Sequence, residues 1–416
     1  MDRRQFLKTT ALALPFAAAG RRAAFAQAPT IKAGILAPLT GVVASGGKEM
    51  VEGTRFFFER IGNEVAGRRI ELVIEDDASN PDVALQKARR LVEQAGVHFL
   101  MGNLLANTGL AVANYVKGTG TPYFIPIIAA DDLTQRQRIR NVIRVAGYTA
   151  SAFTHPLGDW AIRNGYRRMA TISQDYTFGH EQCGGFAQVF TEGGGEIVAQ
   201  LWNPLNTADF SPYLGQLADM KIDAVFAMQN GADANRLLQQ YASFGLKERI
   251  PILGAMNLTD QAVIRTLGPE CEGIVSPAHF AEGSDNLVTR TFVAEYGERY
   301  GKIPSLFGFS MYSGAMWVSK AIEKLDGKVE DRDAFIDAVL ATTLPDSPLG
   351  KEVSLDRWGN PVYDVLIRKV ARRDDGKYWN VPLETYPQVS QFWKYDPEAY
   401  LRQPPYSRTF QGIRRS

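Results

Sequence analysis

The stretch "RIELVIEDDASNPDVALQKARRLVEQAGVHFLMGN", residues 69–103, contains a complete strand–helix–strand unit. Its first nine residues are a short apolar run that ends in acidic residues, and residues 97–103 are a second apolar run. Between them the sequence predicts a helix, with Asn80 as its N-cap and Pro81 at its first position. Two strands joined by a helix pair in parallel, because the connecting helix must pack back onto the sheet.

The same alternation continues on both sides of this unit. A first block of strands and helices covers residues 31–128, and a second block covers residues 166–256. Each block predicts a parallel sheet with helices on both faces. The expected fold class is therefore α/β, with two doubly wound, Rossmann-like lobes. A long helical region, 285–326, and a hairpin at 364–379 are expected to return to the first and second lobes respectively.

The last residues differ in composition from these blocks. The tail from Leu383 is rich in proline and aromatic residues. We expect it to lie extended along the surface of the second lobe, with its rings tucked in.

The amino terminus has the three parts of an export signal. Residues 1–26 have a charged start, an apolar run at 11–19 and small residues before a predicted cleavage after Ala26. The apolar run is too short to span a hydrocarbon core of about 30 Å. "RRQFLK", residues 3–8, also resembles the twin-arginine consensus. We expect export to the periplasm by the twin-arginine route, and an ordinary secretory signal is the alternative.

The net charge and the number of cysteines indicate which partners and which fold classes this chain can have. Removal of residues 1–26 takes five basic residues and one acidic residue from the 46 and 45 of the full chain, which leaves 41 and 44 and a net charge of −3. This near balance argues against nucleic acid or an anionic membrane surface as a partner. A mature chain of about 390 residues is longer than the chains that usually fold around a single hydrophobic core, so two domains are expected. Cys183 and Cys271 could form a disulfide or remain buried thiols.

The sequence contains no complete catalytic or cofactor-binding motif. "LTGVVASGGKEM", residues 39–50, resembles a phosphate-binding loop, but Val42 occupies the first glycine position and Glu49 the position of the magnesium-binding hydroxyl. The four histidines share no metal-ligand spacing, and no nucleophile elbow is present. We therefore expect no metal, no cofactor and no catalysis.

Several segments together resemble one family. "ILAPLTG" (35–41), "PYFIP" (122–126), "DDLT" (131–134), "TADFSPYLGQL" (207–217), "LQQYASFGL" (238–246) and most of the opening stretch are similar to the periplasmic solute-binding proteins of branched-chain-amino-acid-type ABC importers. The resemblance covers nearly all of the mature chain, in order. "TISQDYTFGHE" (171–181), "DSPLG" (346–350) and "NPVYDVLIRKV" (360–370) most resemble members that bind aromatic or related organic acids.

The resemblance implies a type I fold, in which two lobes joined by three hinge crossings hold a ligand between them. The crossings are expected near residues 143–147, 273–277 and 351–355. The N-terminal lobe would comprise 27–145 and 276–352, and the C-terminal lobe 146–275 and 353–416. The implied protein is a monomer that delivers its ligand to an ABC permease and ATPase complex. A ligand-sensing subunit of a receptor is an alternative with the same fold, and an exported enzyme is a third class.

The resemblance also implies which residues face the ligand. Relatives often have an aromatic residue where this chain has Gly46, so that glycine either opens the pocket or only eases the turn into a helix. Loops of the first lobe would bind the ligand carboxylate, although Thr108 could simply cap a helix. For the aromatic candidates, plain core packing is the alternative. The full set of expected ligand-binding residues is Gly46, Asn103, Leu104, Asn107, Thr108, Ile128, Ala129, Tyr148, Tyr176, Phe178, Asn230 and Met256.

Two of these positions bear on the ligand's chemistry. Amino-acid-binding relatives hold the ligand ammonium with a carboxylate where this chain has Met256, and Ala129 lacks a hydroxyl that completes their grip on the carboxylate. An unpaired buried ammonium is costly. We therefore expect a small organic acid without an ammonium, preferably an aromatic carboxylate. A branched-chain amino acid or an amide is the alternative ligand.

Overall fold

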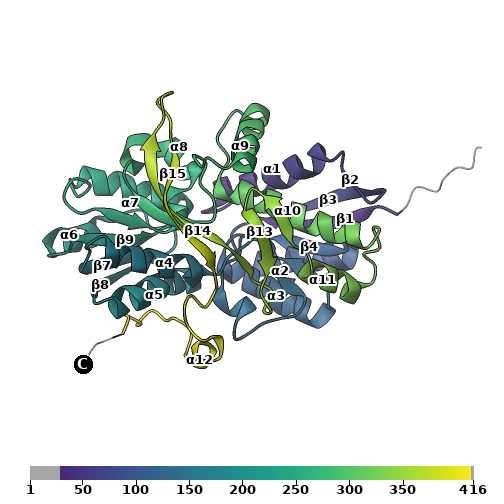
Figure 1. Ribbon diagram of the computed structural model, residues 1–416, viewed down its shortest axis with the longest axis horizontal. Helices are drawn as coiled ribbons and strands as arrows, with labels where there is room; N and C mark the ends of the chain where they lie inside the picture. Colours follow the sequence, from purple (N-terminus) through teal and green to yellow (C-terminus); the bar gives the residue numbers. More distant parts are fainter. Residues whose placement is uncertain (1–28, 414–416) are drawn as a thin grey trace, which may run out of the picture.

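The computed structural model describes residues 29–413. The predicted signal peptide, with its twin arginines and its cleavage site, lies outside the described residues. Two α/β bodies lie side by side, and strands β13 and β14 pass between them (Figure 1). In the described part of the chain, no helix combines the length and apolar character needed to cross a membrane.

The N-terminal lobe is built on a six-stranded sheet with the order β2-β3-β1-β4-β5-β6. All pairings are parallel except that of β2 with β3. Strand β1 lies between β3 and β4, with Ile31 opposite Ile70 and Ala33 opposite Phe99. The elements are β1 (Ile31–Ala37), α1 (Ala44–Arg60), β2 (Glu64–Val65), β3 (Arg68–Asp76), α2 (Pro81–Arg89), η1 (Arg90–Gln94), β4 (Phe99–Gly102), α3 (Ala106–Thr119), β5 (Tyr123–Phe124), η2 (Asp131–Thr134) and β6 (Val142–Ile143).

The strand–helix–strand unit at 69–103 is confirmed. Helix α2 begins at Pro81, and the Asn80 side chain accepts hydrogen bonds from the backbone N–H groups of Asp82 and Val83 at its start. This side-chain cap satisfies two of the donors that a helix start leaves without partners.

The C-terminal lobe contains a nine-stranded sheet with the order β12-β13-β14-β11-β10-β9-β7-β8, and β15 pairs with β14. Its elements before the second crossing are α4 (Ala150–Arg163), β7 (Arg168–Gln174), α5 (Thr177–Glu192), β8 (Glu196–Asn203), α6 (Ser211–Asp219), β9 (Ala224–Met228), α7 (Gly231–Ser243), β10 (Ile252–Gly254), η3 (Met256–Thr259), α8 (Gln261–Leu267), η4 (Gly268–Cys271) and β11 (Val275–Ala278).

The first three helices after the second crossing pack on the first lobe. The later elements are α9 (Leu287–Tyr300), α10 (Leu306–Lys324), α11 (Arg332–Leu340), β12 (Leu344–Ser347), β13 (Gly350–Leu355), β14 (Pro361–Arg372), β15 (Tyr378–Val389) and α12 (Pro397–Arg402). Helices α1 and α10 touch closely: a Cβ added to Gly53 would lie 2.0 Å from the carbonyl oxygen of Gly308. The Tyr296 hydroxyl of α9 donates to Glu52 of α1 at 2.8 Å.

Three features differ from the sequence-based expectation. Both sheets are mixed rather than parallel, because β2 pairs antiparallel at one edge and the hairpin β14–β15 joins the second sheet in the antiparallel sense. Strand β5 is only two residues long, since Pro122 and Pro126 flank it and proline cannot donate to a ladder. The tail from Leu383 is extended only in part. Its first residues complete strand β15, but helix α12 follows within the tail.

Two residues within the expected crossings have an uncommon backbone conformation. Ala146 and Glu352 both have positive φ, 56° and 55°, a conformation that non-glycine residues rarely adopt. Strand β11 still belongs to the second sheet up to Ala278, so the chain leaves that lobe slightly later than residues 273–277. Cys183 and Cys271 are both buried and free, which decides against the disulfide.

Candidate functional site

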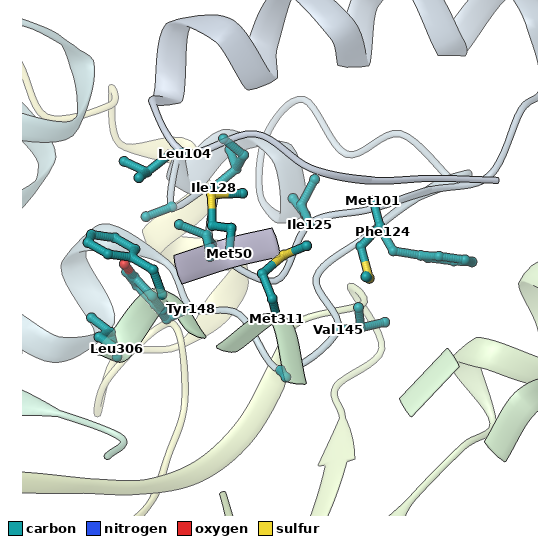
Figure 2. Packing of buried hydrophobic residues seen from close by; sticks show 14 of the residues in the cluster. Met50, Met101, Leu104, Phe124, Ile125, Ile128, Val145, Tyr148, Leu306 and Met311 are labelled. Atoms are coloured by element: carbon teal, nitrogen blue, oxygen red, sulfur yellow. The ribbon is translucent and has the colours of Figure 1, made fainter. Parts of the chain in front are cut away.

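The expected ligand-binding residues lie at the carboxyl ends of strands in both sheets. In the first sheet these are the ends of β1, β4 and β5, and in the second those of β7, β9 and β10. Ligands of open α/β sheets bind at this edge. Figure 2 shows Leu104, Ile128, Met50, Tyr148 and Leu306 among the buried hydrophobic residues of one cluster.

The start of α3 offers unused backbone donors. Leu105 occupies the N-cap position, and no side chain caps the helix. The Thr108 hydroxyl donates to the Leu105 carbonyl at 2.8 Å, and the Asn107 side chain accepts from the Thr108 N–H at 3.1 Å. Thr108 is fully buried. Its hydroxyl oxygen can still accept but not donate elsewhere, so the anion-binding capacity here comes mainly from the helix N–H groups and the helix dipole.

Asn103 is committed to internal hydrogen bonds. Its side-chain N–H donates to Asp77 at 2.7 Å, and the Tyr123 hydroxyl donates to its Oδ1 at 2.6 Å. Its own backbone N–H donates to Leu36 at 2.7 Å, and its φ is +55°. Asn103 therefore holds the loop in shape, and these bonds use one of its two side-chain N–H donors.

Gly46 makes room for side chains of this protein. It lies in the first turn of α1, and an added Cβ would lie 2.9 Å from Leu104 Cδ1 and 2.9 Å from Phe307 Cδ2. The space that an aromatic side chain at 46 would fill is thus taken by Leu104 and Phe307. A small cavity of about 10 Å³, lined by Gly46, Phe307, Gly231 and Asn257 among others, adjoins them.

A buried arginine positions two of the cleft loops. The Arg144 guanidinium is fully buried and donates to the carbonyls of Ile128, Ala130 and Tyr148. Burial lowers the pKa of Arg144 to about 10, so it stays charged at neutral pH. Ile128 and Tyr148 are themselves buried, and the side chain of Ile128 packs on Gly109 of α3. Ala129 contributes its carbonyl, which accepts from the N–H of Ala150 at 2.9 Å.

The expected ligand-binding residues of the C-terminal lobe include two aromatic side chains and one side-chain amide. The Asn230 side-chain N–H donates to the Tyr176 hydroxyl at 2.8 Å, and the rings of Tyr176 and Phe178 lie 6.1 Å apart. Asn230 is 1% exposed, yet its Oδ1 has no hydrogen-bond partner among the described residues. Burial raises the pKa of both Tyr148 and Tyr176, which keeps the two phenols neutral.

Met256 brings no charge to the site. It is fully buried at the start of η3, and its carbonyl accepts from Arg368 at 3.1 Å. The remaining donors of Arg368 go to Ser276, Thr259 and the Phe280 carbonyl. Arg368 therefore holds the Met256 turn in place against the second crossing.

The two lobes are in contact across the cleft. The Glu49 carboxylate of α1 pairs with Arg265 of α8 and also accepts from the N–H of Ser305 at 3.0 Å. Asp260, which caps α8, accepts from the N–H of Leu306 in α10 at 2.8 Å. A Cβ on Gly231 would lie 2.4 Å from the Val42 carbonyl oxygen. These contacts describe a closed conformation.

Two acidic residues meet beside this closed cleft. Glu181 of α5 accepts from the backbone N–H of Asp131 at 3.0 Å, and the Asp131 carboxylate accepts from the N–H of Ser151 at 3.2 Å. Burial raises the pKa of Asp131 to about 6 and that of Glu181 well above its usual range, and the charge of Asp131 raises the pKa of Glu181 further. Glu181 is thus held neutral, with Oε2 buried and unpartnered.

Sequence reasoning missed Phe307, Arg144, Arg368 and Glu181 as residues of this site. An arginine within the apolar run "NVIRVAGY" is the one local signal, because buried charges are rare unless paired. Phe307 reaches the cleft from a helix that follows the second crossing, so no local pattern places it beside Gly46.

The sequence profile of the periplasmic binding protein family matches residues 30–377. The Leu/Ile/Val-binding protein homolog 6 of Brucella abortus is 28% identical over 371 residues, covering 88% of this chain and 93% of the relative. An ABC transporter substrate-binding protein from Sphaerobacter thermophilus superposes with a TM-score of 0.81 at 31% identity, covering 87% of this chain and 99% of that one.

A further solved structure carries a ligand. The solute-binding protein of an ABC transporter from Rhodopseudomonas palustris BisB5, in complex with 3,4-dihydroxybenzoic acid, has a TM-score of 0.82 at 29% identity, covering 87% of this chain and 98% of that one. The family consists of solute-binding proteins rather than enzymes. The chain therefore belongs to the periplasmic binding protein family and has the type I fold of the solute-binding proteins of ABC transporters.

Proposed function

We propose that this protein captures a small aromatic carboxylate between its lobes and delivers it to an ABC permease. The ligand carboxylate binds at the start of α3, and its ring lies against the aromatic residues of the facing wall. Export by the twin-arginine route and action as a monomer are part of this proposal. The similarity to the R. palustris protein that holds 3,4-dihydroxybenzoic acid supports the ligand class.

One observation carries the proposal: the start of α3 has no side-chain cap, and the nearby carboxylates Glu49 and Asp260 already have partners. Met256 is apolar at the position where amino-acid binders of the resembling family have an acid. Glu49 and Asp260 are already paired with Arg265 and with backbone N–H groups. An ammonium brought here would lose its hydration without a counter-charge, which costs several kcal/mol.

Branched-chain amino acid binding is the second candidate, and one observation favours it. Glu181 Oε2 is buried without a partner, so it could face an ammonium. The raised pKa of Glu181 opposes this role, because a neutral carboxyl supplies no counter-charge. The name of the B. abortus relative refers to such amino acids. The two candidates differ in a single measurable property, the charge that the ligand carries beside its carboxylate.

Calorimetric titration tests the choice. Benzoate and 3,4-dihydroxybenzoate should bind the wild-type protein, and leucine and valine should not. At about 100 times its dissociation constant, a ligand that binds only the folded form should stabilise it by about 2.7 kcal/mol in a parallel thermal denaturation. Tight leucine binding that Glu181→Gln abolishes would establish the second candidate and overturn the first.

A further inference from the structure

A cavity of about 730 Å³ lies beside the second crossing, and none of the expected ligand-binding residues lines it. Its walls come from α9, from residues 282–285 that lead into α9, and from the turn of the β14–β15 hairpin. Helix α9 and this hairpin reach the same edge of the molecule (Figure 1). The volume is typical of small-molecule sites, which measure about 300–1,000 Å³. The cavity is therefore a candidate site separate from the cleft.

The two main walls of this cavity belong to different lobes. The Tyr296 hydroxyl of α9 donates to Glu52 of α1 at 2.8 Å, which attaches one wall to the first lobe. On the other wall, the Gln261 side chain of α8 donates to the Tyr378 carbonyl at 3.2 Å, which attaches the hairpin to the second lobe. A molecule that contacts both walls therefore holds the lobes together.

Each wall carries one cation without a partner. Arg290 of α9 and Lys377 of the hairpin turn are both exposed and both line the cavity. Among the described residues, neither side chain makes an ion pair or a hydrogen bond. Lys302, which also lines the cavity, is already paired with Glu52 at 2.8 Å. An anion in the cavity can thus pair with both lobes at once.

The acidic residues of the cavity offset this charge only in part. The Glu282 carboxylate is buried and accepts from the backbone N–H of Asn380 at 2.9 Å. Asp375 pairs with Arg373 at 3.3 Å. Asp285 is exposed, and it has no partner among the residues that the structure describes. Two unpaired cations thus outnumber one unpaired carboxylate, so the cavity favours an anion.

Trp379 adds an aromatic surface to the hairpin wall. Its ring is half-buried, and the Arg373 guanidinium carbon lies 4.4 Å from the ring centroid. A Cβ on Gly283 would lie 3.0 Å from Trp379 Cε2, so a glycine lets the crossing chain approach the indole closely. The indole is held in place by these contacts, and its remaining surface can stack on a flat group.

We propose that this cavity is a second ligand site, which binds a small aromatic polyanion and thereby favours the closed form of the protein. Arg290 and Lys377 pair with the negative groups from opposite walls, and Trp379 stacks on the ring. A benzene polycarboxylate and a nucleoside phosphate share this chemistry. The inference does not depend on which ligand the cleft binds.

Calorimetric titration of the mature protein with benzene-1,3,5-tricarboxylate and, separately, with AMP tests the site. At least one of them should bind. Arg290→Gln and Lys377→Gln should each weaken that binding about twofold to fivefold, as expected for exposed ion pairs. Asp285→Asn should strengthen it by a similar factor. Lys221→Gln, which removes an exposed charge after α6, is the matched control and should have no effect.

Two further measurements test the ring and the closure. Cyclohexane-1,3,5-tricarboxylate has the same charge but no π face, and it should bind about threefold to tenfold more weakly than the benzene compound. In small-angle X-ray scattering, the bound anion should lower the radius of gyration of the wild-type protein. The variant that combines Arg290→Gln with Lys377→Gln should show no compaction at the same concentration.

The inference is wrong if neither anion binds, or if binding is the same in all three cavity variants as in the wild-type protein. Variant-sensitive binding without compaction would overturn the link to closure. Failure of benzoate to bind the cleft would leave these results unaffected, so the proposed function and this inference are tested separately.

Discussion

His279 shows how a buried titratable residue makes this fold depend on pH. Its ring stacks between Phe153 and Tyr363, with centroids 5.3 and 5.2 Å away, just after the second crossing begins. Burial, assisted by Arg368, lowers the pKa of His279 to about 3. The folded protein therefore keeps the ring neutral at pH values where the unfolded chain protonates it.

The sign of the effect follows from this difference in proton binding. Stability is fully present above the unfolded pKa of about 6.5 and is lost as the pH falls toward 3. Between pH 7 and pH 5, His279 should cost about 2 kcal/mol of unfolding free energy. Replacement by phenylalanine keeps the stacked ring and should remove about that much of the pH dependence in urea denaturation. Equal dependence in both proteins would show that His279 is already neutral in the unfolded chain or charged in the folded one.

At the scale of single residues, the sequence predicts some of the site and not the rest. Met256 and Ala129 are informative because a missing functional group is visible in the sequence itself. The glycine at position 46 is also visible in the sequence. The packing of Phe307 against it is not, since Phe307 is more than 250 residues away along the chain. The internal role of Asn103 was not predictable, because no sequence pattern shows that Asp77 and Tyr123 form hydrogen bonds with its amide.

At the scale of elements, a substitution in the first turn of α3 should affect helix stability and ligand binding in opposite directions. Asn107→Asp places a carboxylate in the first turn, where the helix dipole stabilises it by a few tenths to about 1 kcal/mol. The same charge should repel a ligand carboxylate and weaken benzoate binding at least tenfold. Asn107→Ser, which adds no charge, is the matched control. Unchanged benzoate affinity in Asn107→Asp would place the ligand's acid group elsewhere.

The C-terminal tail depends on a glycine in α5. Tyr406 donates to Gln188 and bonds the His155 ring at 2.9 Å, and a Cβ on Gly184 would lie 2.4 Å from Tyr406 Cγ. Gly184→Ala should therefore cost about 1–3 kcal/mol in unfolding free energy and expose the tail to limited proteolysis. Gly215→Ala in α6, where an added Cβ meets nothing within 4 Å, should be neutral or slightly stabilising. A tail equally resistant in both variants would contradict this packing.

Elements with strong local signals were predicted well. Helix α2 has its cap and its proline, and the hairpin β14–β15 follows an alternating pattern around the turn at 373–377. The mixed character of the sheets was not predictable from alternation alone, because strand direction depends on which edge the hairpin joins. The helix α12 within the tail was hidden by surrounding prolines.

For the whole molecule, the closed arrangement depends on polar contacts between lobes. Arg265 reaches from α8 to Glu49 and also donates to the Ile303 carbonyl at 2.6 Å. Lys302 lies 3.5 Å from the same carboxylate. Opening the lobes breaks the contacts of Arg265 and exposes Glu49 to water. Ligand contacts to both walls add to these polar contacts, so a bound ligand should shift the population toward the closed form.

Small-angle X-ray scattering tests the central claim most directly, because one measurement reports both the ligand class and the closure. The radius of gyration of the mature protein should fall as benzoate saturates the site and should not change with leucine at the same concentration. Compaction by leucine, or calorimetrically tight benzoate binding with an unchanged radius, would contradict the account of an aromatic acid held between closing lobes.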